Sequence, residues 1–230
     1  MDRLILFDLD GTLIRSYAGF VPFNQAIEKT FGLSADIRTV IPDGNTDPLI
    51  LEDVFDTSKL RVKITKEKWA SFAKNLVESY TNAIAQGLTK VIPLTGVLDL
   101  VKELAKKKGL HQGVVTGNLE ATGRLKLQAA GLALHVGLGA YGSDSRNRVD
   151  LPRIAKQRWE TVLGRSICSH HCVIVGDTAK DLIAARQNHM KCVLVGTGRY
   201  PVEELGLLGP DVCLSDLTDT KAAAEALLNL

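Results

Sequence analysis

Two carboxylates near the start of the chain have the types and the spacing that most clearly point to chemistry. The apolar residues 4–7 lead directly into Asp8 and Asp10, and Gly11 follows. Side chains two positions apart share one face of an extended chain, so we expect both carboxylates together at the end of a buried strand. Two unit charges about 4 Å apart repel by roughly 4 kcal/mol at an effective dielectric constant near 20. Asp-Gly is also common in turns, and the pair alone is compatible with a plain turn.

A second acidic segment strengthens the case for a metal site. In VIVGDTAKD, residues 173–181, Asp177 ends an apolar run and Asp181 follows it. Thr116, Gly117 and Asn118 end another apolar run in the same way. Ligands of open parallel sheets bind beyond the carboxyl ends of the strands, so these polar groups should converge. Oxygen-rich clusters of this kind suit Mg²⁺, which would offset the repulsion among the four acids.

The elements that must position these groups follow an α/β pattern. Short β-branched runs alternate with helical patterns from residue 94 onward, and their near-continuous apolar character favours parallel strands covered on both faces. We expect strands at 4–7, 112–116, 172–175, 191–195 and 212–214. We expect helices at 97–105, 119–130, 151–163, 179–188 and 219–230.

Residues 16–92 differ from the rest, because they contain no convincing strand and at least three helical segments. These are 22–31, 48–55 and a longer helix between Thr65 and Gly87 whose aromatic stripe should be core. We therefore predict an α/β core formed by residues 1–15 and 93–230, interrupted by an all-helical domain at 16–92. The hinges should lie near 14–17 and 91–94.

Composition narrows the possible partners. Of 230 residues, 45% are hydrophobic and 23% charged, and the net charge of +2 gives no reason to expect nucleic acid or a membrane surface as partner. No apolar run approaches the roughly 20 residues of a membrane span, and no signal-peptide pattern is visible. Cys168, Cys172, Cys192 and Cys213 form no disulfide framework, which favours the cytoplasm. CSHHC, residues 168–172, has no second ligand pair, so we expect no structural metal there.

The order DLDGTL, VVTGN, VIVGDTAKD resembles the haloacid dehalogenase-like superfamily, in particular its phosphatase branch. The closing segment VLVGTGRYPVEELGLLGPDVCLSDL resembles that of phosphoglycolate-phosphatase-like members. The resemblance implies a Rossmann-like parallel sheet with a small helical cap. It also implies Mg²⁺-dependent hydrolysis of a small phosphorylated metabolite such as phosphoglycolate.

The resemblance further implies roles for the four acids. Asp8 matches the nucleophile that becomes an aspartyl-phosphate, and Asp10 matches the general acid that later activates water. Asp177 matches the principal Mg²⁺ ligand, beside Asp8 and the backbone carbonyl of Asp10. Asp181 matches a metal ligand or a residue that supports one. A carboxylate nucleophile divides one hard displacement into two easier steps.

Phosphate contacts are expected from residues around these acids. Thr116 matches the hydroxyl that binds the transferring phosphoryl group, assisted by backbone N–H groups around Gly117 and Asn118. Gly11 allows the backbone to approach the phosphate closely. Thr12 either hydrogen-bonds near the general acid or has a plain turn role.

The cation of the site is the least defined position. Members of the superfamily usually carry a lysine followed by proline ahead of a helix, and this chain has no Lys-Pro dipeptide. Arg148 stands at the matching place, with Arg146 and Lys126 as alternatives. A solvated loop arginine is the other interpretation of Arg148.

Several functions share this pattern. Asp10 makes a dehalogenase or phosphonate-cleaving function less favoured, because relatives with those activities lack an acid at that position. A sugar-phosphate mutase resembling β-phosphoglucomutase and a non-catalytic phosphate-binding protein remain alternatives. The polar loop 44–46 of the cap either faces the substrate or forms an ordinary turn.

Overall fold

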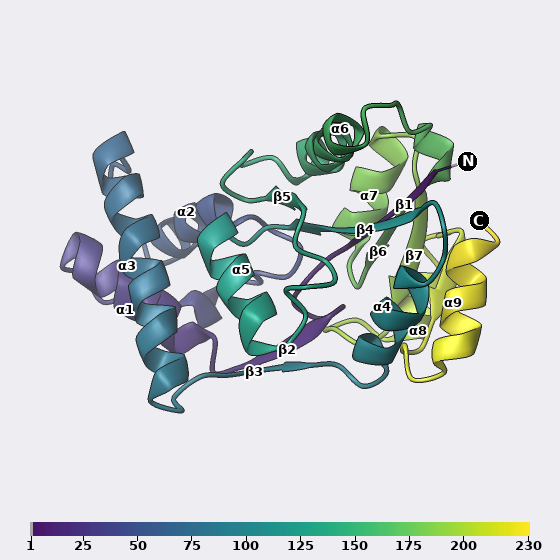
Figure 1. Ribbon diagram of the computed structural model, residues 1–230. Coiled ribbons are helices and arrows are strands. Elements are labelled where there is room, and N and C mark those ends of the chain that lie inside the picture. Colours follow the sequence, from purple (N-terminus) through teal and green to yellow (C-terminus); the bar gives the residue numbers. More distant parts are fainter. Residues whose placement is uncertain (1) are drawn as a thin grey trace.

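A six-stranded parallel sheet forms the core of the protein, whose computed structural model describes residues 2–230; residue 1 of the expected core lies outside that range. The strand order is β5-β4-β1-β6-β7-β8, so the N-terminal strand is central (Figure 1). The strands are β1 (Arg3–Phe7), β4 (Leu110–Thr116), β5 (Gly139–Tyr141), β6 (Cys172–Gly176), β7 (Lys191–Val195) and β8 (Val212–Leu214).

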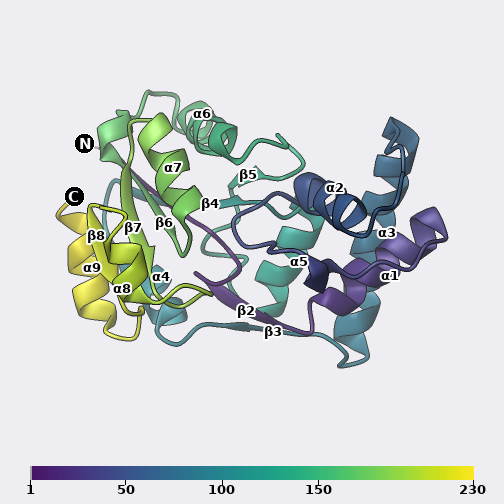
Figure 2. The same cartoon turned by 180° about the vertical axis from the view of Figure 1, so that it is seen from behind.

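Side chains of the central strand alternate between two hydrophobic layers. Ile5 and Phe7 belong to the layer packed under α4 (Val97–Ala105), α5 (Glu120–Ala129) and α9 (Thr220–Leu228). Leu4 and Leu6 belong to the layer under α6 (Leu151–Leu163), α7 (Ala179–Gln187) and α8 (Val202–Gly206). Figures 1 and 2 show these helices on the two faces of the sheet. Burial on both faces explains why the strands are continuously apolar in sequence.

Three helices form a separate layer beyond the carboxyl ends of the strands: α1 (Phe20–Phe31), α2 (Asp47–Thr57) and α3 (Lys66–Ala85). They enclose their own core, in which the Phe72 ring meets the Phe23 ring edge-on at 5.3 Å. We refer to this layer as the cap. Both chain termini lie at the end of the molecule away from the cap (Figure 2).

A two-stranded antiparallel ribbon connects the cap to the core. Its strands are β2 (Ile14–Tyr17) and β3 (Lys90–Pro93), which pair Ile14 with Pro93 and Tyr17 with Lys90. The expectation that residues 16–92 contain no strand is therefore wrong at both ends of that segment. The ribbon occupies the expected hinge positions. Each strand is only four residues long, too short for a clear alternation of polar and apolar side chains.

The α/β fold class is confirmed, and the five expected strands and the expected helices are present with small differences at their ends. Strand β5 and helix α8 were not expected. They have three and five residues, below the length at which periodicity is informative.

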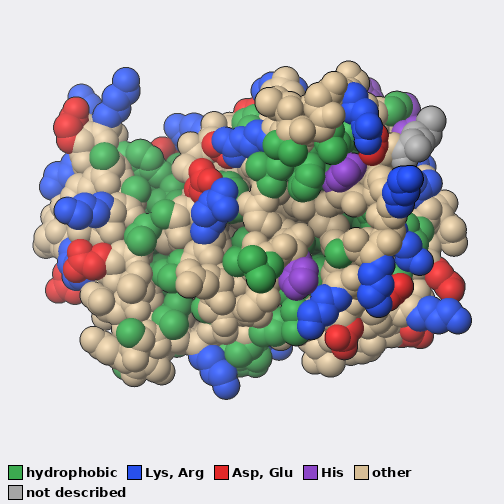
Figure 3. All heavy atoms as spheres, in the orientation of Figure 1, with side chains coloured by type: hydrophobic (Ala, Val, Ile, Leu, Met, Phe, Trp, Pro, Cys, Tyr) green, Lys and Arg blue, Asp and Glu red, His purple; other side chains and the backbone are tan. Residues whose placement is uncertain are grey.

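The surface agrees with the near-neutral net charge. Lys and Arg side chains are scattered over the face in Figure 3, with Asp and Glu among them. Within residues 2–230, no helix combines the length and apolar character needed to cross a membrane. All four cysteines are free.

Candidate active site

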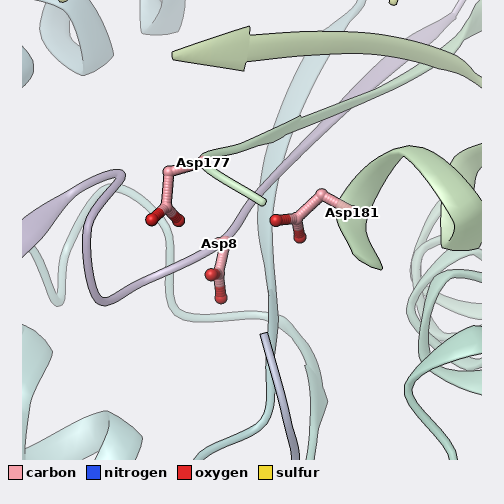
Figure 4. Close-up of side chains that lie close together, drawn as sticks. All are labelled: Asp8, Asp177 and Asp181. Carbon is pink, nitrogen blue, oxygen red and sulfur yellow. The ribbon is translucent and has the colours of Figure 1, made fainter. Parts of the chain in front are cut away.

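Three buried carboxylates meet beyond the carboxyl ends of β1 and β6. One oxygen from each of Asp8, Asp177 and Asp181 lies within 4.8 Å of the others. Figure 4 shows the three carboxylates close together. Asp8 directly follows β1, Asp177 directly follows β6, and Asp181 lies in the first turn of α7. Because β1 and β6 are hydrogen-bonded neighbours, their ends bring residues 169 positions apart in sequence into one cluster. We refer to these three residues as the carboxylate cluster.

Arg148 supplies a cation to the carboxylate cluster from the short 3-10 turn before α6. Its Nη2 lies 3.1 Å from Asp8 Oδ1 and donates to Asp181 Oδ1 at 2.5 Å. The side chain of Arg148 is only 7% exposed, so the solvated-loop interpretation is wrong. Asp181 Oδ2 accepts hydrogen bonds from the backbone N–H and hydroxyl of Thr178, which caps α7. Both oxygens of Asp181 therefore have protein partners, an arrangement that suits a supporting role.

One arginine does not balance three carboxylates, and the pKa values reflect this. Burial, opposed by Arg148, raises the pKa of Asp8 to about 7. Burial and the charge of Asp8 raise the pKa of Asp177 to about 9. Further positive charge would therefore be needed to hold both groups fully ionised at neutral pH.

The residues around Asp177 fit a small hard cation. A Cβ atom at Gly11 or at Gly198 would overlap the Asp177 carboxylate, so two glycines make room for it. Thr12 donates its hydroxyl to Asp177 Oδ1 at 3.2 Å, so this residue supports the carboxylate cluster and not Asp10. An all-oxygen donor set of this kind is what Mg²⁺ prefers.

Asp10 lies in a different charge environment. Strand β1 ends at Phe7, and the chain turns tightly through Gly11, which has a φ of 86°. Asp10 Oδ2 accepts hydrogen bonds from Lys126 Nζ and Asn118 Nδ2, both at 2.8 Å. Asp8 and Asp10 thus line the same cavity, but Asp10 does not belong to the carboxylate cluster. The expectation that the two carboxylates lie side by side is therefore only partly correct.

The pKa of Asp10 is lowered, in contrast to those of Asp8 and Asp177. Burial alone would raise it, but the charge of Lys126 and hydrogen bonds from Lys126, Asn118 and Ser16 hold the pKa below its ordinary value. Two acids two positions apart therefore differ in protonation behaviour, as acids with different chemical tasks do.

Polar groups for a phosphate follow β4 at the same edge. Thr116 Oγ1 accepts a hydrogen bond from Asn118 Nδ2 at 2.8 Å, which leaves its own O–H to donate. Thr116, Gly117 and Asn118 all line the cavity beside Asp8. They precede the N-terminus of α5, where backbone N–H groups favour anions.

A cavity of about 770 Å³ extends from these groups to the cap. Its lining includes aromatic and aliphatic side chains of the cap and three exposed arginines. The apolar group includes Phe20, Phe23, Ile37, Val40 and Ile50, and the arginines are Arg15, Arg38 and Arg199.

The cap segment 42–47 contacts helix α7 and core loops beside this cavity. Lys180 Nζ donates to Asn45 Oδ1 at 2.5 Å, and Arg199 Nε donates to Asp43 Oδ2 at 2.8 Å. Asp47 is buried and accepts a hydrogen bond from the backbone N–H of Leu119 at 2.8 Å. Of the polar loop 44–46, Gly44 and Asn45 line the cavity, and the backbone N–H of Asn45 also closes a turn onto the Pro42 carbonyl. Sequence reasoning missed Asp47 and Lys180, because nothing local marks residues whose partners lie in another layer.

The three cations considered for the site have three different partners. Arg148 meets the carboxylate cluster and Lys126 meets Asp10, whereas Arg146 donates to Glu52 of the cap at the surface. Arg146 is 60% exposed, so it is not a buried charge of this site. Each of the two acids near the start of the chain thus has its own buried cation.

The family model described as haloacid dehalogenase-like hydrolase matches residues 3–189. The chain belongs to the haloacid dehalogenase-like hydrolase family. It is accordingly a hydrolase, and the matched range includes all four aspartates and both buried cations of the site.

Known proteins resemble the chain over nearly its full length, one of them in sequence and two of them in fold. The chain is 26% identical to "Probable phosphatase IndB" of Dickeya dadantii (strain 3937), over 100% of this chain and 96% of that protein. The CbbY structure from Rhodobacter sphaeroides, in complex with phosphate, superposes with a TM-score of 0.72 at 19% identity and covers 100% of both chains. A "predicted phosphoglycolate phosphatase" from Haemophilus somnus 129pt gives a TM-score of 0.68 at 20% identity, covering 96% of this chain and 97% of that one.

Proposed function

We propose that the chain is a Mg²⁺-dependent phosphatase that hydrolyses a small phosphate monoester of the phosphoglycolate type. The observation that carries the proposal is the separation of Asp8 and Asp10. Asp8 lies in the carboxylate cluster beside Arg148, and Asp10 lies against Lys126 in the same cavity. Two acids in different electrostatic environments at one cavity suit a nucleophile and a proton-transfer group.

The first step transfers the phosphoryl group to the protein. An Asp8 carboxylate oxygen attacks phosphorus, the P–O bond to the substrate alcohol breaks, and the alcohol oxygen takes a proton from Asp10. Thr116 donates its hydroxyl to a phosphoryl oxygen, while Arg148 offsets the charge that Asp8 and the phosphoryl group bring together. The product of this step is an aspartyl-phosphate and the free alcohol.

The second step releases phosphate. Asp10, now a carboxylate, takes a proton from a water molecule whose oxygen attacks phosphorus, and the bond to Asp8 breaks. Lys126, Asn118 and Ser16 hold this carboxylate in place to accept the proton. The pKa of Asp10 is lowered in the free protein. For the first step, the negative charge of the bound phosphate ester has to raise the pKa of Asp10, so that it carries the proton that it donates. One acid–base group contributes about 10²–10⁴-fold to rate, far less than hydrolysis of a phosphate monoester requires.

Mg²⁺ would be held by Asp8 and Asp177, with Asp181 in support and the backbone carbonyl of Asp10 as a further ligand. When bound it neutralises charge on the phosphoryl oxygens and on the clustered carboxylates. The raised pKa values of Asp8 and Asp177 and the space left by Gly11 and Gly198 support this assignment.

The substrate type is supported by the relatives and by the cavity. Similar proteins are named as phosphatases, one of them a phosphoglycolate phosphatase, and one related structure is a complex with phosphate. The cavity has room for the alcohol part of a small metabolite, and its arginines suit one that carries a second negative charge.

We also infer that the protein works in the cytoplasm, because its four cysteines are free. We assign the helical cap to residues 16–92 and the core to 1–15 and 93–230.

The test is release of orthophosphate from a panel of phosphorylated metabolites and p-nitrophenyl phosphate. We expect turnover that EDTA abolishes and Mg²⁺ restores, and a loss of at least ~10³-fold in Asp8→Asn. Asp99→Asn, an exposed aspartate on α4, is the matched control and should keep full activity. Metal-independent turnover or an active Asp8→Asn variant would contradict the proposal. Isomerisation of a sugar phosphate without release of orthophosphate would indicate the mutase alternative, and phosphate binding without turnover would indicate a binding protein.

A further inference from the structure

Lys126 occupies an unusual place beside the reacting groups. It lies in α5, and its side chain is 5% exposed. Its ammonium group donates to Asp10 Oδ2 at 2.8 Å and to Asn118 Oδ1 at 2.7 Å. The ring of Tyr80, which belongs to the cap, lies 5.1 Å from the same nitrogen and attracts it electrostatically.

Two protein acceptors and one aromatic ring surround the ammonium group. An ammonium group has three N–H donors and no acceptor, and a carboxylate oxygen of Asp10 and the amide oxygen of Asn118 accept two of them. Lys126 itself is among the residues that line the cavity, and the Tyr80 ring lies beside the same nitrogen. Its direct hydrogen bonds within the protein are thus to Asp10 and Asn118, through which it can order the site.

The lysine fixes which way the Asn118 amide faces. Because Lys126 can only donate, Asn118 must present its oxygen to the lysine and its NH₂ group to Asp10 Oδ2 and Thr116 Oγ1, each at 2.8 Å. A reversed amide would place a donor against the ammonium group and an acceptor against the Asp10 carboxylate. The lysine thus orders the Asn118 amide, which donates to Asp10 and Thr116, two groups that contact the phosphate ester in the proposed reaction.

Asp10 is held from both sides by this arrangement. Lys126 and Asn118 bond Oδ2, and the Ser16 hydroxyl donates to Oδ1 at 2.7 Å. The terminal torsion of an aspartate is otherwise broad, so a carboxylate without such partners samples many orientations. A misplacement of about 1 Å in a reacting group costs about 10²-fold in rate.

We propose that Lys126 is a positioning residue that aims the Asp10 carboxyl group at the oxygen of the leaving alcohol. This inference rests on the proposed phosphatase reaction, in which Asp10 gives a proton to that oxygen. Its consequence is selective, because protonation matters greatly for an alkoxide leaving group and little for a stabilised phenolate. Loss of Lys126 should therefore slow the hydrolysis of esters with poor leaving groups most.

The test compares kcat/KM for p-nitrophenyl, phenyl and benzyl phosphate, three esters of similar shape and increasingly poor leaving groups. We expect Lys126→Met to lower the value for benzyl phosphate at least tenfold more than the value for p-nitrophenyl phosphate. Arg124→Met removes a positive charge from the same helix at a side chain that is 53% exposed, and should leave the ratio unchanged. Lys126→Gln provides the same comparison if the methionine variant does not fold.

An equal loss on all three esters would show a merely structural role and would overturn the inference. A relative gain on benzyl phosphate would show that the lysine acts through charge alone, and would overturn it as well. In an Asp10→Asn background, the leaving-group effect of Lys126→Met should disappear, because the positioned group is gone. A wild-type protein that hydrolyses none of the esters with Mg²⁺ would instead count against the proposed function.

Discussion

Replacing Arg148 by methionine tests whether the carboxylate cluster depends on this one arginine. Its Nη2 lies 3.1 Å from Asp8 Oδ1 and 2.5 Å from Asp181 Oδ1, and the three side chains are between 1% and 7% exposed. Removing one partner of a buried ion pair costs about 3–5 kcal/mol, because the remaining charge stays buried. Among the residues that the structure describes, Arg148 is the one cation that pairs with these carboxylates. Arg148→Met removes it.

The expected effect is large on the scale of thermal unfolding. For a protein of this size, each kcal/mol shifts Tm by about 2–4 °C, so Arg148→Met should unfold about 6–20 °C below the wild type in EDTA at pH 8. The pKa values of Asp8 and Asp177 are about 7 and about 9, so both groups are largely protonated near pH 6. Because protonated carboxyl groups carry no charge, the loss of stability in Arg148→Met should be smaller near pH 6 than at pH 8. Added Mg²⁺ should raise Tm more in the variant than in the wild type, because the ion replaces the missing charge.

The assay is differential scanning calorimetry of the wild type, Arg148→Met and Arg146→Met, each in EDTA and in Mg²⁺. Arg146→Met is the control, because Arg146 pairs with Glu52 at the surface with side chains 60% and 40% exposed. Exposed pairs contribute up to about 1 kcal/mol, so this control should stay within about 4 °C of the wild type. An Arg148→Met variant as stable as the wild type in EDTA, or an equal loss in Arg146→Met, would refute this reasoning.

Three further predictions concern the metal site, the cap contact and the cap core. Gly198→Ala places a Cβ atom against the Asp177 carboxylate, and should weaken Mg²⁺ binding at least about tenfold in calorimetric titration. Gly206→Ala, where no atom lies within 4 Å of a Cβ, should bind normally. Burial raises the pKa of Asp47 to about 6, so its stabilising contribution is present below the unfolded value of 3.8 and is lost as pH rises through 6. Between pH 5 and pH 8, the free energy of unfolding of Asp47→Asn, measured in urea, should therefore rise by about 1.4 kcal/mol relative to that of the wild type. A difference between the two proteins that does not change with pH would contradict this. Phe72→Ala empties a fully buried site and should lower the free energy of unfolding by about 3–5 kcal/mol; a loss below about 1 kcal/mol would disagree.

Local patterns in the sequence were enough to predict the layered core. Continuous apolar runs mark strands buried on both faces, and glycines or capping residues mark helix ends such as Thr65 and Gly164. The segments that escaped prediction, β2, β3, β5 and α8, are three to five residues long. Such short segments take their conformation from neighbours in space more than from their own periodicity.

The sequence by itself determined which acids lie at the ends of which strands. Asp8 and Asp177 must come together once β1 and β6 pair in parallel, because strand ends meet at one sheet edge. Only the tertiary structure decided how the cations are distributed. Lys126 reaches Asp10 across 116 positions and Arg148 reaches Asp181 across 33, and both contacts depend on how helices pack on the sheet. The direction of a buried side chain is set by its partners in the folded chain, which no local pattern specifies.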